Sequence, residues 1–245
     1  MNPFDLTGKT ILVTGATAGL GRQTAITLSR LGARLIITGR NESRLEATAA
    51  ELSGSEHLAY PADLTQTAAR DALVAQMPGL DGISHCAGVT LLHPFKFSTE
   101  RHYHEVYAIN VEAPLFLTQR LFKGKRLNHG ASIVFVSSLG AFIGARGHSI
   151  YAGSKAALVG VMRVLAHELA VSRIRVNCLS PGMVKTEVVD GFAQQVSREL
   201  VDADEARYPL GYGHPEDVAN AVAFFLSPAG KWITGQNLIM DGGLT

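Results

Sequence analysis

The sequence is poor in cysteine and tryptophan and has almost no net charge. Its 245 residues contain two cysteines and one tryptophan, and the formal net charge is +1, with no block of like charges. A disulfide-built secreted fold and a basic nucleic-acid-binding surface are therefore not expected. Both cysteines, Cys86 and Cys178, stand inside apolar runs, which is typical of small buried side chains rather than of a disulfide or a metal site.

Linkers rich in proline or serine, internal repeats and long hydrophobic runs are also lacking. No stretch approaches the length of a membrane-spanning helix, and the first residues have neither the basic nor the apolar region of a signal peptide. Since α/β folds of this length are often undivided, one domain over residues 1–245 is predicted. We expect a soluble, cytoplasmic protein with no membrane and no nucleic-acid partner.

What the sequence does contain is a series of short apolar runs that alternate with helical patterns. This alternation predicts an α/β fold in which a mostly parallel sheet is covered by helices on both faces. Asn41 is expected to cap the start of one helix and Gly32 the end of the preceding helix. The runs that we interpret as strands are Thr10–Thr14, Arg34–Thr38, His57–Ala62, Gly82–Cys86, Ser132–Ser137, Arg175–Leu179 and Asn237–Met240.

The first apolar run leads directly into the glycine-rich segment Thr14–Gly21, which is followed by an apolar-periodic segment. This order predicts strand, glycine turn and helix. Glycines allow the backbone to approach a pyrophosphate closely, and the helix N-terminus offers free amide donors, so a dinucleotide would fit. A glycine turn without a ligand is the alternative, and the spacing is G-x-x-x-G-x-G rather than G-x-G-x-x-G.

A second pattern places Tyr151 and Lys155 four residues apart, with Ser138 at the end of an apolar run thirteen positions before the tyrosine. On a helix, residues four apart share a face, so the ammonium group can lie beside the phenol. A neighbouring positive charge favours the ionised phenol, and we therefore expect the lysine to lower the pKa of the tyrosine. The pattern predicts a proton-transfer site, although each residue has an ordinary structural explanation by itself.

Together these motifs resemble the short-chain dehydrogenase/reductase family, in order and in separation, over almost the whole chain. The resemblance implies a Rossmann-type, doubly wound, seven-stranded sheet. One departure is that the family usually has an asparagine before its Ala-Gly pair, where this chain has His85-Cys86; we interpret His85 as a structural substitute. The resemblance is carried by Thr14, Gly15, Gly19, Gly21, Asp63, Ala87, Gly88, Asn110, Ser138, Tyr151, Lys155, Pro181 and Gly182.

The resemblance also implies roles for individual residues. Tyr151 would exchange a proton with the substrate oxygen, Ser138 would hold that oxygen, Lys155 would support the tyrosinate and bind the nicotinamide ribose, and Asn110 would position a water. Asp63 would contact the adenine. The residues expected to bind the cofactor are Gly15, Thr17, Gly19, Leu20, Gly21, Arg40, Asp63, Leu64, Ala87, Gly88, Asn110, Tyr151, Lys155, Pro181, Gly182, Val184 and Thr186.

The identity of the cofactor depends on the end of the second strand, where a carboxylate would hold the ribose 2′-hydroxyl of NAD. This chain has Gly39 and then Arg40, and a guanidinium suits a 2′-phosphate. NADP(H) is therefore the expected cofactor, with NAD(H) as the alternative. The opposing interpretation is that Arg40 is a solvated turn residue. No metal site is expected.

The function that follows is an NADP(H)-dependent oxidoreductase acting on a small-molecule carbonyl or alcohol. A 3-oxoacyl thioester is the leading substrate; the alternatives are a sugar or other small alcohol, or a non-catalytic cofactor-sensing protein. Residues 183–210 are expected to form a substrate lid. A buried, small-residue helix over 152–166 indicates a homo-oligomer, a tetramer or a dimer. Lys123, Lys125, Arg126 and Arg173 are the candidates for binding an acyl carrier protein, with a solvated basic face as the alternative.

Overall fold

Seven parallel strands form one sheet in the computed structural model, which describes residues 2–187 and 198–245, in the order β3-β2-β1-β4-β5-β6-β7. Every neighbouring pair in the sheet is parallel. The strands are β1 (Thr10–Thr14), β2 (Arg34–Gly39), β3 (Leu58–Pro61), β4 (Leu80–His85), β5 (Leu127–Val136), β6 (Arg175–Pro181) and β7 (Asn237–Met240). The expected doubly wound α/β sheet is confirmed.

The largest difference from the expected boundaries is in β5, which begins at Leu127 rather than at Ser132. Leu127 pairs with Leu80, and the register then shifts before Ser132 pairs with Gly82. The early part of the strand has one apolar and several polar or glycine residues, and most of it is exposed. An apolar run could not reveal it, because only pairing with β4 makes this part a strand.

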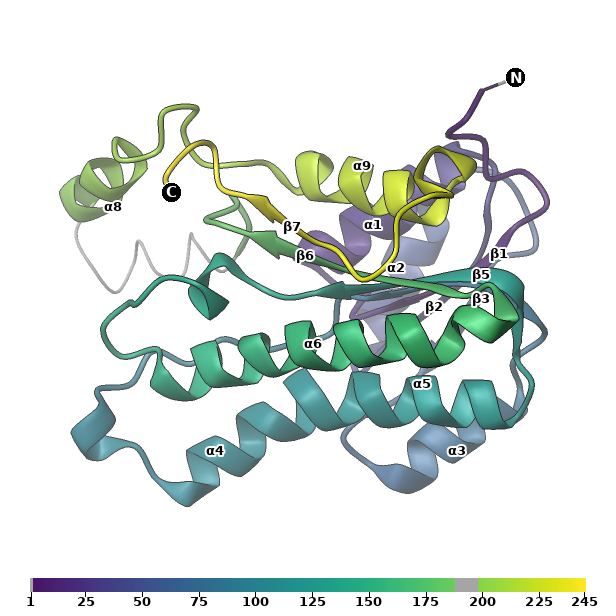
Figure 1. Cartoon of the computed structure of the whole chain (residues 1–245), viewed down its shortest axis with the longest axis horizontal. Helices are drawn as coiled ribbons and strands as arrows, with labels where there is room; N and C mark the ends of the chain where they lie inside the picture. Colours follow the sequence, from purple (N-terminus) through teal and green to yellow (C-terminus); the bar gives the residue numbers. More distant parts are fainter. Residues whose placement is uncertain (1, 188–197) are drawn as a thin grey trace.

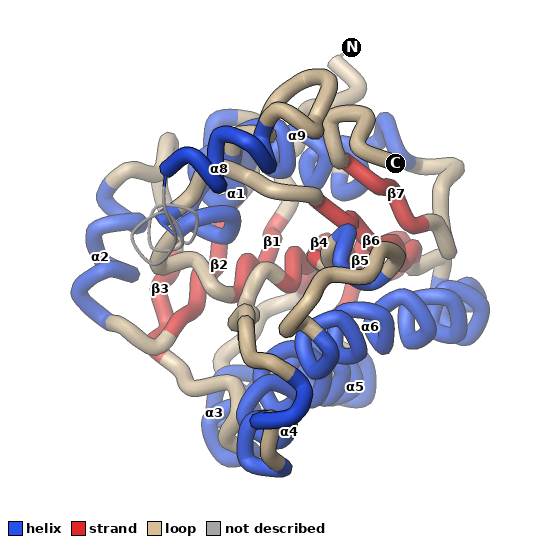
Figure 2. The backbone as a smooth tube through the Cα atoms, turned by 90° about the vertical axis from the view of Figure 1, so that its left-hand side faces the viewer, coloured by secondary structure: helices blue, strands red, loops and turns tan. Residues whose placement is uncertain are grey.

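Helices cover both faces of the sheet, as Figures 1 and 2 show. Helices α1, α2 and α9 lie on one face, and α3, α4, α5 and α6 lie on the other. The helices are α1 (Gly19–Arg30), α2 (Glu42–Ala50), α3 (Thr67–Ala75), α4 (Glu100–Tyr107), α5 (Ala113–Lys123), α6 (Ser149–Glu168), α8 (Arg198–Glu205) and α9 (Pro215–Leu226), with a π-helical turn η2 (Ala108–Glu112) and 3₁₀ turns η1 (Phe95–Phe97), η3 (Leu139–Ala141), η4 (Leu169–Ser172) and η5 (Pro228–Gly230).

Both expected helix ends are confirmed. The Asn41 side chain accepts a hydrogen bond from the Arg44 backbone N–H at 2.9 Å and so caps α2. After α1, Gly32 adopts a φ of +91°, and the Ala33 N–H bonds back to the Leu28 carbonyl. This is the left-handed termination that glycine tolerates best.

The strand order reverses between β1 and β4, because the chain builds β2 and β3 on one side of β1 and the later strands on the other. In open α/β sheets a crevice forms at this point, beyond the carboxyl ends of the strands. The glycine turn follows β1, Asp63 follows β3, Ala87 follows β4, and Ser138 follows β5. The fold therefore gathers the expected site residues at one edge of the sheet.

Helix α6 corrects one expectation. Together with η4 it forms a segment, Ser149–Ser172, that is long and apolar enough by composition to cross a membrane, with a mean hydropathy of 1.2. In the fold, however, Leu158 and Met162 of this segment are buried against β5 and β6. The apolar composition follows from packing on the sheet, which requires apolar residues on the covered face of a helix.

Candidate active site

The glycine turn between β1 and α1 forms a cradle of bare backbone. A Cβ atom on Gly21 would lie 2.2 Å from the Gly15 carbonyl oxygen, and one on Gly15 would lie 2.7 Å from the Ala87 Cα. Ala18 stands at the N-cap of α1 with no side-chain hydrogen bond, and the first turn of the helix has no acidic residue. The amide donors at this helix end are thus not satisfied by a cap, which suits a bound anion.

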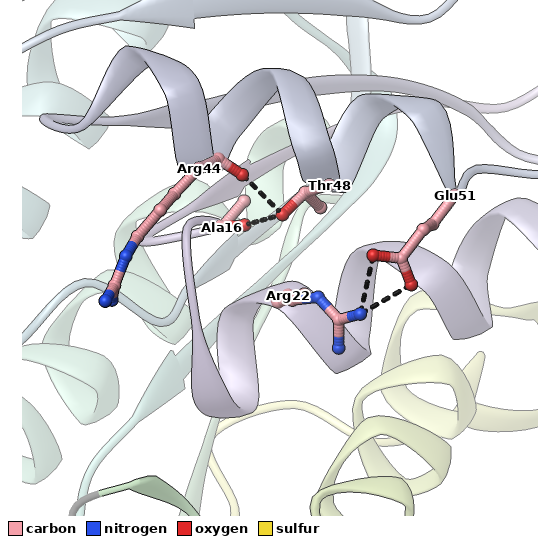
Figure 3. Close-up of polar contacts among 5 residues, drawn as sticks. All are labelled: Ala16, Arg22, Arg44, Thr48 and Glu51. Atoms are coloured by element: carbon pink, nitrogen blue, oxygen red, sulfur yellow. Dashed lines mark hydrogen bonds and ion pairs between the residues drawn. The ribbon is translucent and has the colours of Figure 1, made fainter.

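Helix α2 holds this turn in place, as Figure 3 shows. The Thr48 hydroxyl donates to the buried Ala16 carbonyl at 2.9 Å and lies 3.1 Å from the Arg44 carbonyl. At the C-cap of the same helix, Glu51 accepts two hydrogen bonds from the Arg22 guanidinium on α1. The turn is therefore fixed from α2 by a buried hydroxyl, with an exposed ion pair beside it.

At the end of β2 the structure explains why no carboxylate is present. A Cβ atom on Gly39 would lie 2.5 Å from the Thr17 Cγ2 atom, so the Thr17 side chain occupies the place of a side chain at 39. The next residue, Arg40, is exposed and has no hydrogen-bond or ion-pair partner among the described residues. Arg44 lies nearby on α2, where its guanidinium is 3.5 Å from the Glu187 carboxylate. The end of β2 therefore offers a cationic group and no carboxylate, and the Glu187 carboxylate at this corner is paired with Arg44.

Beyond β3, Asp63 and Leu64 form a tight turn. One Asp63 carboxylate oxygen, Oδ1, accepts from both the Thr65 backbone N–H at 3.0 Å and the Thr65 hydroxyl at 2.8 Å. Leu64 is buried in the core between the sheet and α3 and α5. The turn is rigid, and its backbone lies at the same edge of the sheet as the glycine turn.

His85, at the end of β4, is a structural residue. It is buried, lies 2.9 Å from the Thr118 hydroxyl through Nε2, and stacks on Phe135 with 4.9 Å between ring centroids. Burial lowers the pKa of His85 to about 3, so the ring is neutral at physiological pH. A neutral imidazole held between α5 and β5 is consistent with the interpretation of His85 as a substitute for the family's asparagine.

Asn110 lies in the π-helical turn η2 and is 1 % exposed. Its Nδ2 donates to the Val89 carbonyl at 2.9 Å and to the Ser154 hydroxyl at 3.0 Å, and its Oδ1 accepts from the Val89 N–H at 2.9 Å. A Cβ atom on Gly88 would lie 3.0 Å from Oδ1, which explains the glycine. Asn110 therefore ties the loop after β4 to helix α6, and π-helical turns are frequent at functional sites.

Tyr151 on α6 and Ser138 after β5 lie close enough for a hydrogen bond between their side chains. The Ser138 hydroxyl oxygen accepts from the Gly140 N–H at 3.1 Å, so its proton is free to be donated. Burial raises the pKa of Tyr151 above its ordinary value, and a hydrogen bond with Ser138 lowers it in part. The expectation that Lys155 would lower the tyrosine pKa is not met in the protein alone, because burial is the dominant effect.

Lys155 is 6 % exposed, and its Nζ donates to the Val136 carbonyl at 2.9 Å. The same atom lies 5.9 Å from the centre of the Tyr151 ring. Burial lowers the pKa of Lys155 to about 8. The buried Cys178 thiol, whose pKa rises to about 12, is neutral and does not offset this effect at physiological pH. At neutral pH the pair is therefore an ammonium beside a protonated phenol.

The segment after β6 returns to the glycine turn. The Gly182 N–H donates to the Met240 carbonyl at 2.8 Å, and Val184 forms a parallel bridge with Gly213. A Cβ atom on Gly19 would lie 3.7 Å from the Thr186 Cγ2 atom, so Thr186 lies over the turn. Of the expected lid, residues 183–210, positions 188–197 lie outside the described residues.

Comparison with known proteins decides the family. The family model described as enoyl-(acyl carrier protein) reductase matches residues 15–245. A 3-oxoacyl-[acyl-carrier-protein] reductase of Rickettsia bellii is 35% identical over 242 residues, which cover 98% of each chain. The chain belongs to the short-chain dehydrogenase/reductase family.

Other members of this family that resemble the chain have different printed activities. An NAD-dependent glycerol dehydrogenase of Listeria innocua is 32% identical over 248 residues, covering 99% of this chain and 96% of the relative. A solved structure from Beutenbergia cavernae, provisionally an NAD(P)-dependent gluconate 5-dehydrogenase with NADP bound at low occupancy, is 30% identical with a TM-score of 0.88 and 99% coverage of both chains. Family membership therefore shows an oxidoreductase of this class without fixing its substrate.

Some residues that matter to the geometry have no role in the sequence analysis. Ser154 is fully buried; its hydroxyl donates to the Tyr151 carbonyl at 2.7 Å while accepting from Asn110. Thr48 anchors the glycine turn. The position of Ser154 directly before Lys155 was the only available signal for it, because hydroxyls that bond to distant groups leave no pattern in the sequence.

The basic residues considered for a carrier protein lie away from this site. Arg126 directly precedes β5, its carbonyl accepting from the N–H of Leu80 at the start of β4, and Arg173 precedes β6. They therefore lie at the starting edge of the sheet, while Ser138 and Tyr151 lie at the other edge.

Neither of two described surface depressions contains a catalytic candidate. One, of about 440 Å³, lies where β1 and β2 begin, and the other, of about 630 Å³, lies between α3 and α5. Ser138, Tyr151 and Lys155 lie outside both depressions, at the edge of the sheet where the strands end.

Proposed function

We propose that this protein is an NADP(H)-dependent oxidoreductase that transfers hydride between nicotinamide and a carbonyl or secondary alcohol, with Tyr151 as the acid and base. The observation that carries the proposal is the convergence of Ser138, Tyr151 and Lys155 beside the loop held by Asn110. The bare glycine cradle fits a dinucleotide pyrophosphate. The cofactor supplies the hydride, and the chain supplies the proton and the orientation.

In the direction of reduction, each side chain has one task. Tyr151 is protonated at neutral pH and donates its proton to the substrate oxygen, which Ser138 holds by a hydrogen bond. Lys155, a cation at that pH, stabilises the phenolate that remains and contacts the nicotinamide ribose. Asn110 fixes the loop at Val89, and by its resemblance to the family's asparagine it would position a water that connects Lys155 to solvent.

The cofactor preference follows from the end of β2. An aspartate or glutamate at 39 would meet Thr17, and the unpaired Arg40 offers a forked donor to a 2′-phosphate. The expected contacts of Asp63 and Leu64 with adenine, and of Ala87, Pro181, Val184 and Thr186 with the nicotinamide half, belong to the same proposal. NAD(H) remains the alternative, since a relative that uses NAD is comparably similar.

A 3-oxoacyl thioester is the leading substrate class. The similarity to 3-oxoacyl-[acyl-carrier-protein] reductases supports it, and so do two walls beside Tyr151, Thr90–Phe95 and Leu139–His148, which contain no carboxylate or amide side chain. Carboxylate and amide oxygens are strong acceptors for the hydroxyl groups of a sugar. A sugar or small-alcohol dehydrogenase is the second candidate, favoured by the glycerol and gluconate dehydrogenases among the relatives.

The remaining parts of the proposal concern the whole protein. We propose one cytoplasmic domain over residues 1–245, with residues 183–210 covering the substrate, assembled as a homotetramer or a dimer. An acyl carrier protein is a candidate partner if the substrate is a carrier-bound thioester. A cofactor-sensing protein without catalysis is the third function; it would not require Tyr151 or Lys155, both of which this chain has.

The test is the change in nicotinamide absorbance when purified protein is mixed with NADPH or NADH and a panel of carbonyls. The panel comprises 3-oxoacyl thioesters, keto-sugars, quinones and cyclic ketones. We expect turnover of 3-oxoacyl thioesters with NADPH preferred. If only keto-sugars are turned over, the substrate is a sugar and not a thioester. A preference for NADH would contradict the role given to Arg40. Tight binding of NADPH without turnover of any substrate would favour a cofactor-sensing protein.

A further inference from the structure

Arg70, on α3, is a buried cation that the catalytic proposal does not use. It is 4 % exposed, its Nη1 donates to the Leu64 carbonyl at 2.6 Å, and its Nη2 donates to the Thr67 hydroxyl at 3.0 Å. Its Nε has no hydrogen-bond partner, and the guanidinium carbon lies 6.0 Å from the centre of the Phe116 ring. Burying a charge without a bonded carboxylate is costly, so the contact with Leu64 needs an explanation.

The Leu64 carbonyl belongs to the turn that follows β3. The buried Arg70 side chain donates a hydrogen bond to this carbonyl. Within the turn, Thr65 donates two hydrogen bonds to the Asp63 Oδ1 atom. The Gln66 N–H donates to the Asp63 carbonyl at 3.0 Å. Two groups of the turn make no hydrogen bond to any described residue: the Asp63 Oδ2 atom and the Leu64 N–H. The result is one acceptor and one donor, on adjacent residues and held rigidly, at the ligand edge of the sheet.

This acceptor and donor match the Watson–Crick edge of adenine, which offers an amino group at N6 beside an acceptor at N1. We propose that Arg70 is a positioning residue: by bonding the carbonyl of the Leu64–Thr65 peptide it fixes Leu64, and so orients the adjacent Leu64 N–H and Asp63 carboxylate to recognise adenine. The inference rests on the proposed binding of NADP(H). Arg70 acts only through Leu64 and does not itself contact the cofactor.

A purely structural role for Arg70 makes a different prediction. In that case the arginine would only pack α3 against Phe116 of α5, and its loss would weaken the binding of any dinucleotide to the same extent. If Arg70 positions the turn, its loss removes discrimination between bases. The ratio of two affinities therefore separates the explanations, because a general loss of stability cancels in the ratio.

The experiment measures equilibrium binding of NADPH and of its hypoxanthine analogue, in which the N6 amino group is replaced by oxygen. We expect the unaltered protein to favour NADPH by about tenfold, the scale of one hydrogen bond. In Arg70→Leu the ratio should fall to nearly one. The matched control is Arg120→Leu, which removes an arginine between α3 and α5 that bonds Asp71 instead of the turn and should leave the ratio unchanged.

Arg70→Lys serves if the leucine variant does not fold, since lysine retains the charge but has a single donor point in place of the planar fork. Its ratio should lie between those of the unaltered protein and one. An unchanged ratio in Arg70→Leu, or in Arg70→Lys where the leucine variant does not fold, would overturn the inference. Absence of NADPH binding in the unaltered protein would overturn the proposed function itself, and this inference with it.

Discussion

At the scale of single residues, burial sets the protonation of Tyr151 and Lys155. Burial, which depends on what lies around a side chain, raises the pKa of Tyr151 and lowers that of Lys155. The spacing of four residues fixed the shared helix face. The electrostatic expectation drawn from it was wrong for the protein alone, because desolvation outweighs the neighbouring charge.

Tyr151→Phe tests the role of the phenol. We expect turnover to fall by at least ~10²-fold, the scale of a positioned acid, with NADPH affinity and the melting temperature nearly unchanged. Steady-state kinetics and NADPH titration measure both quantities. Tyr103→Phe is the control, since Tyr103 is 44 % exposed on α4 and should have normal turnover; turnover of Tyr151→Phe close to that of the control would refute the mechanism.

The depressed pKa of Lys155 predicts a pH dependence of stability. Between about pH 8 and 10.5 the unfolded chain holds a proton that the folded protein has released, so the free energy of unfolding contributed by this group rises with pH across that window. Denaturant unfolding at several pH values should show a less positive slope for Lys155→Met than for the unaltered protein. Comparison of the two slopes removes the effects of cysteines and tyrosines, and identical slopes would contradict the prediction.

The contact between Thr17 and Gly39 predicts a two-residue change of cofactor preference. Gly39→Asp alone should destabilise the protein by about 1–3 kcal/mol, because a new Cβ meets the Thr17 methyl group. Thr17→Ala together with Gly39→Asp leaves that Cβ 3.6 Å from the Cβ at 17, which is ordinary contact. The double variant should recover stability and favour NADH, as measured by kcat/KM with each cofactor; full recovery by the single Gly39→Asp variant would exclude the steric argument.

At the scale of elements, the alternation of apolar runs and helices gave the sheet, whereas contacts between distant elements had no sequence signal. The helix cap at Asn41 was predictable because a cap bonds to its own first turn. Thr48 was not, because the Ala16 carbonyl that it bonds lies 32 residues away. The early part of β5 was likewise missed, since its pairing with β4 and not its composition makes it a strand.

Thr48→Val tests the tie between α2 and the glycine turn. The change keeps the shape but leaves the buried Ala16 carbonyl without its donor, so we expect a loss of about 1–3 kcal/mol in the free energy of unfolding and weaker NADPH binding. Denaturant unfolding and cofactor titration measure these. Glu51→Gln, at the C-cap of the same helix, breaks only the exposed pair with Arg22 and should cost no more than about 1 kcal/mol. If the two changes lower the free energy of unfolding and the NADPH affinity equally, the hydrogen bond from Thr48 to Ala16 has no special role.

At the scale of the whole molecule, one face of α6 has no cover within the described chain. Ala156, Gly160, Arg163, Val164 and His167 are exposed there, while Leu158 and Met162 face the sheet. Small residues permit close approach of a second helix, and Val164, 55 % exposed, lies among them. These observations support the proposed homo-oligomer.

Light scattering should therefore give twice or four times the chain mass of 26.1 kDa. Val164→Glu places a charge on this face and should shift the mass towards that of a monomer. Val171→Glu is the matched control, because Val171 is 83 % exposed on the neighbouring turn η4, outside the stripe. A monomeric unaltered protein would refute the assembly, and an unchanged mass for Val164→Glu would place the interface elsewhere.

The sequence by itself determined the parallel α/β sheet, the glycine turn and the order of the motifs, because these depend on residues adjacent along the chain. Only the tertiary structure decided the protonation of Tyr151 and Lys155. It also brought Thr17 to the place that a side chain at position 39 would need, and Arg70 to within hydrogen-bond distance of the Leu64 carbonyl. It also placed the basic residues Arg126 and Arg173 at the edge of the sheet opposite to Ser138. The physical reason is that burial and contact distance are properties of the surroundings, which are brought together from distant parts of the chain only when it folds.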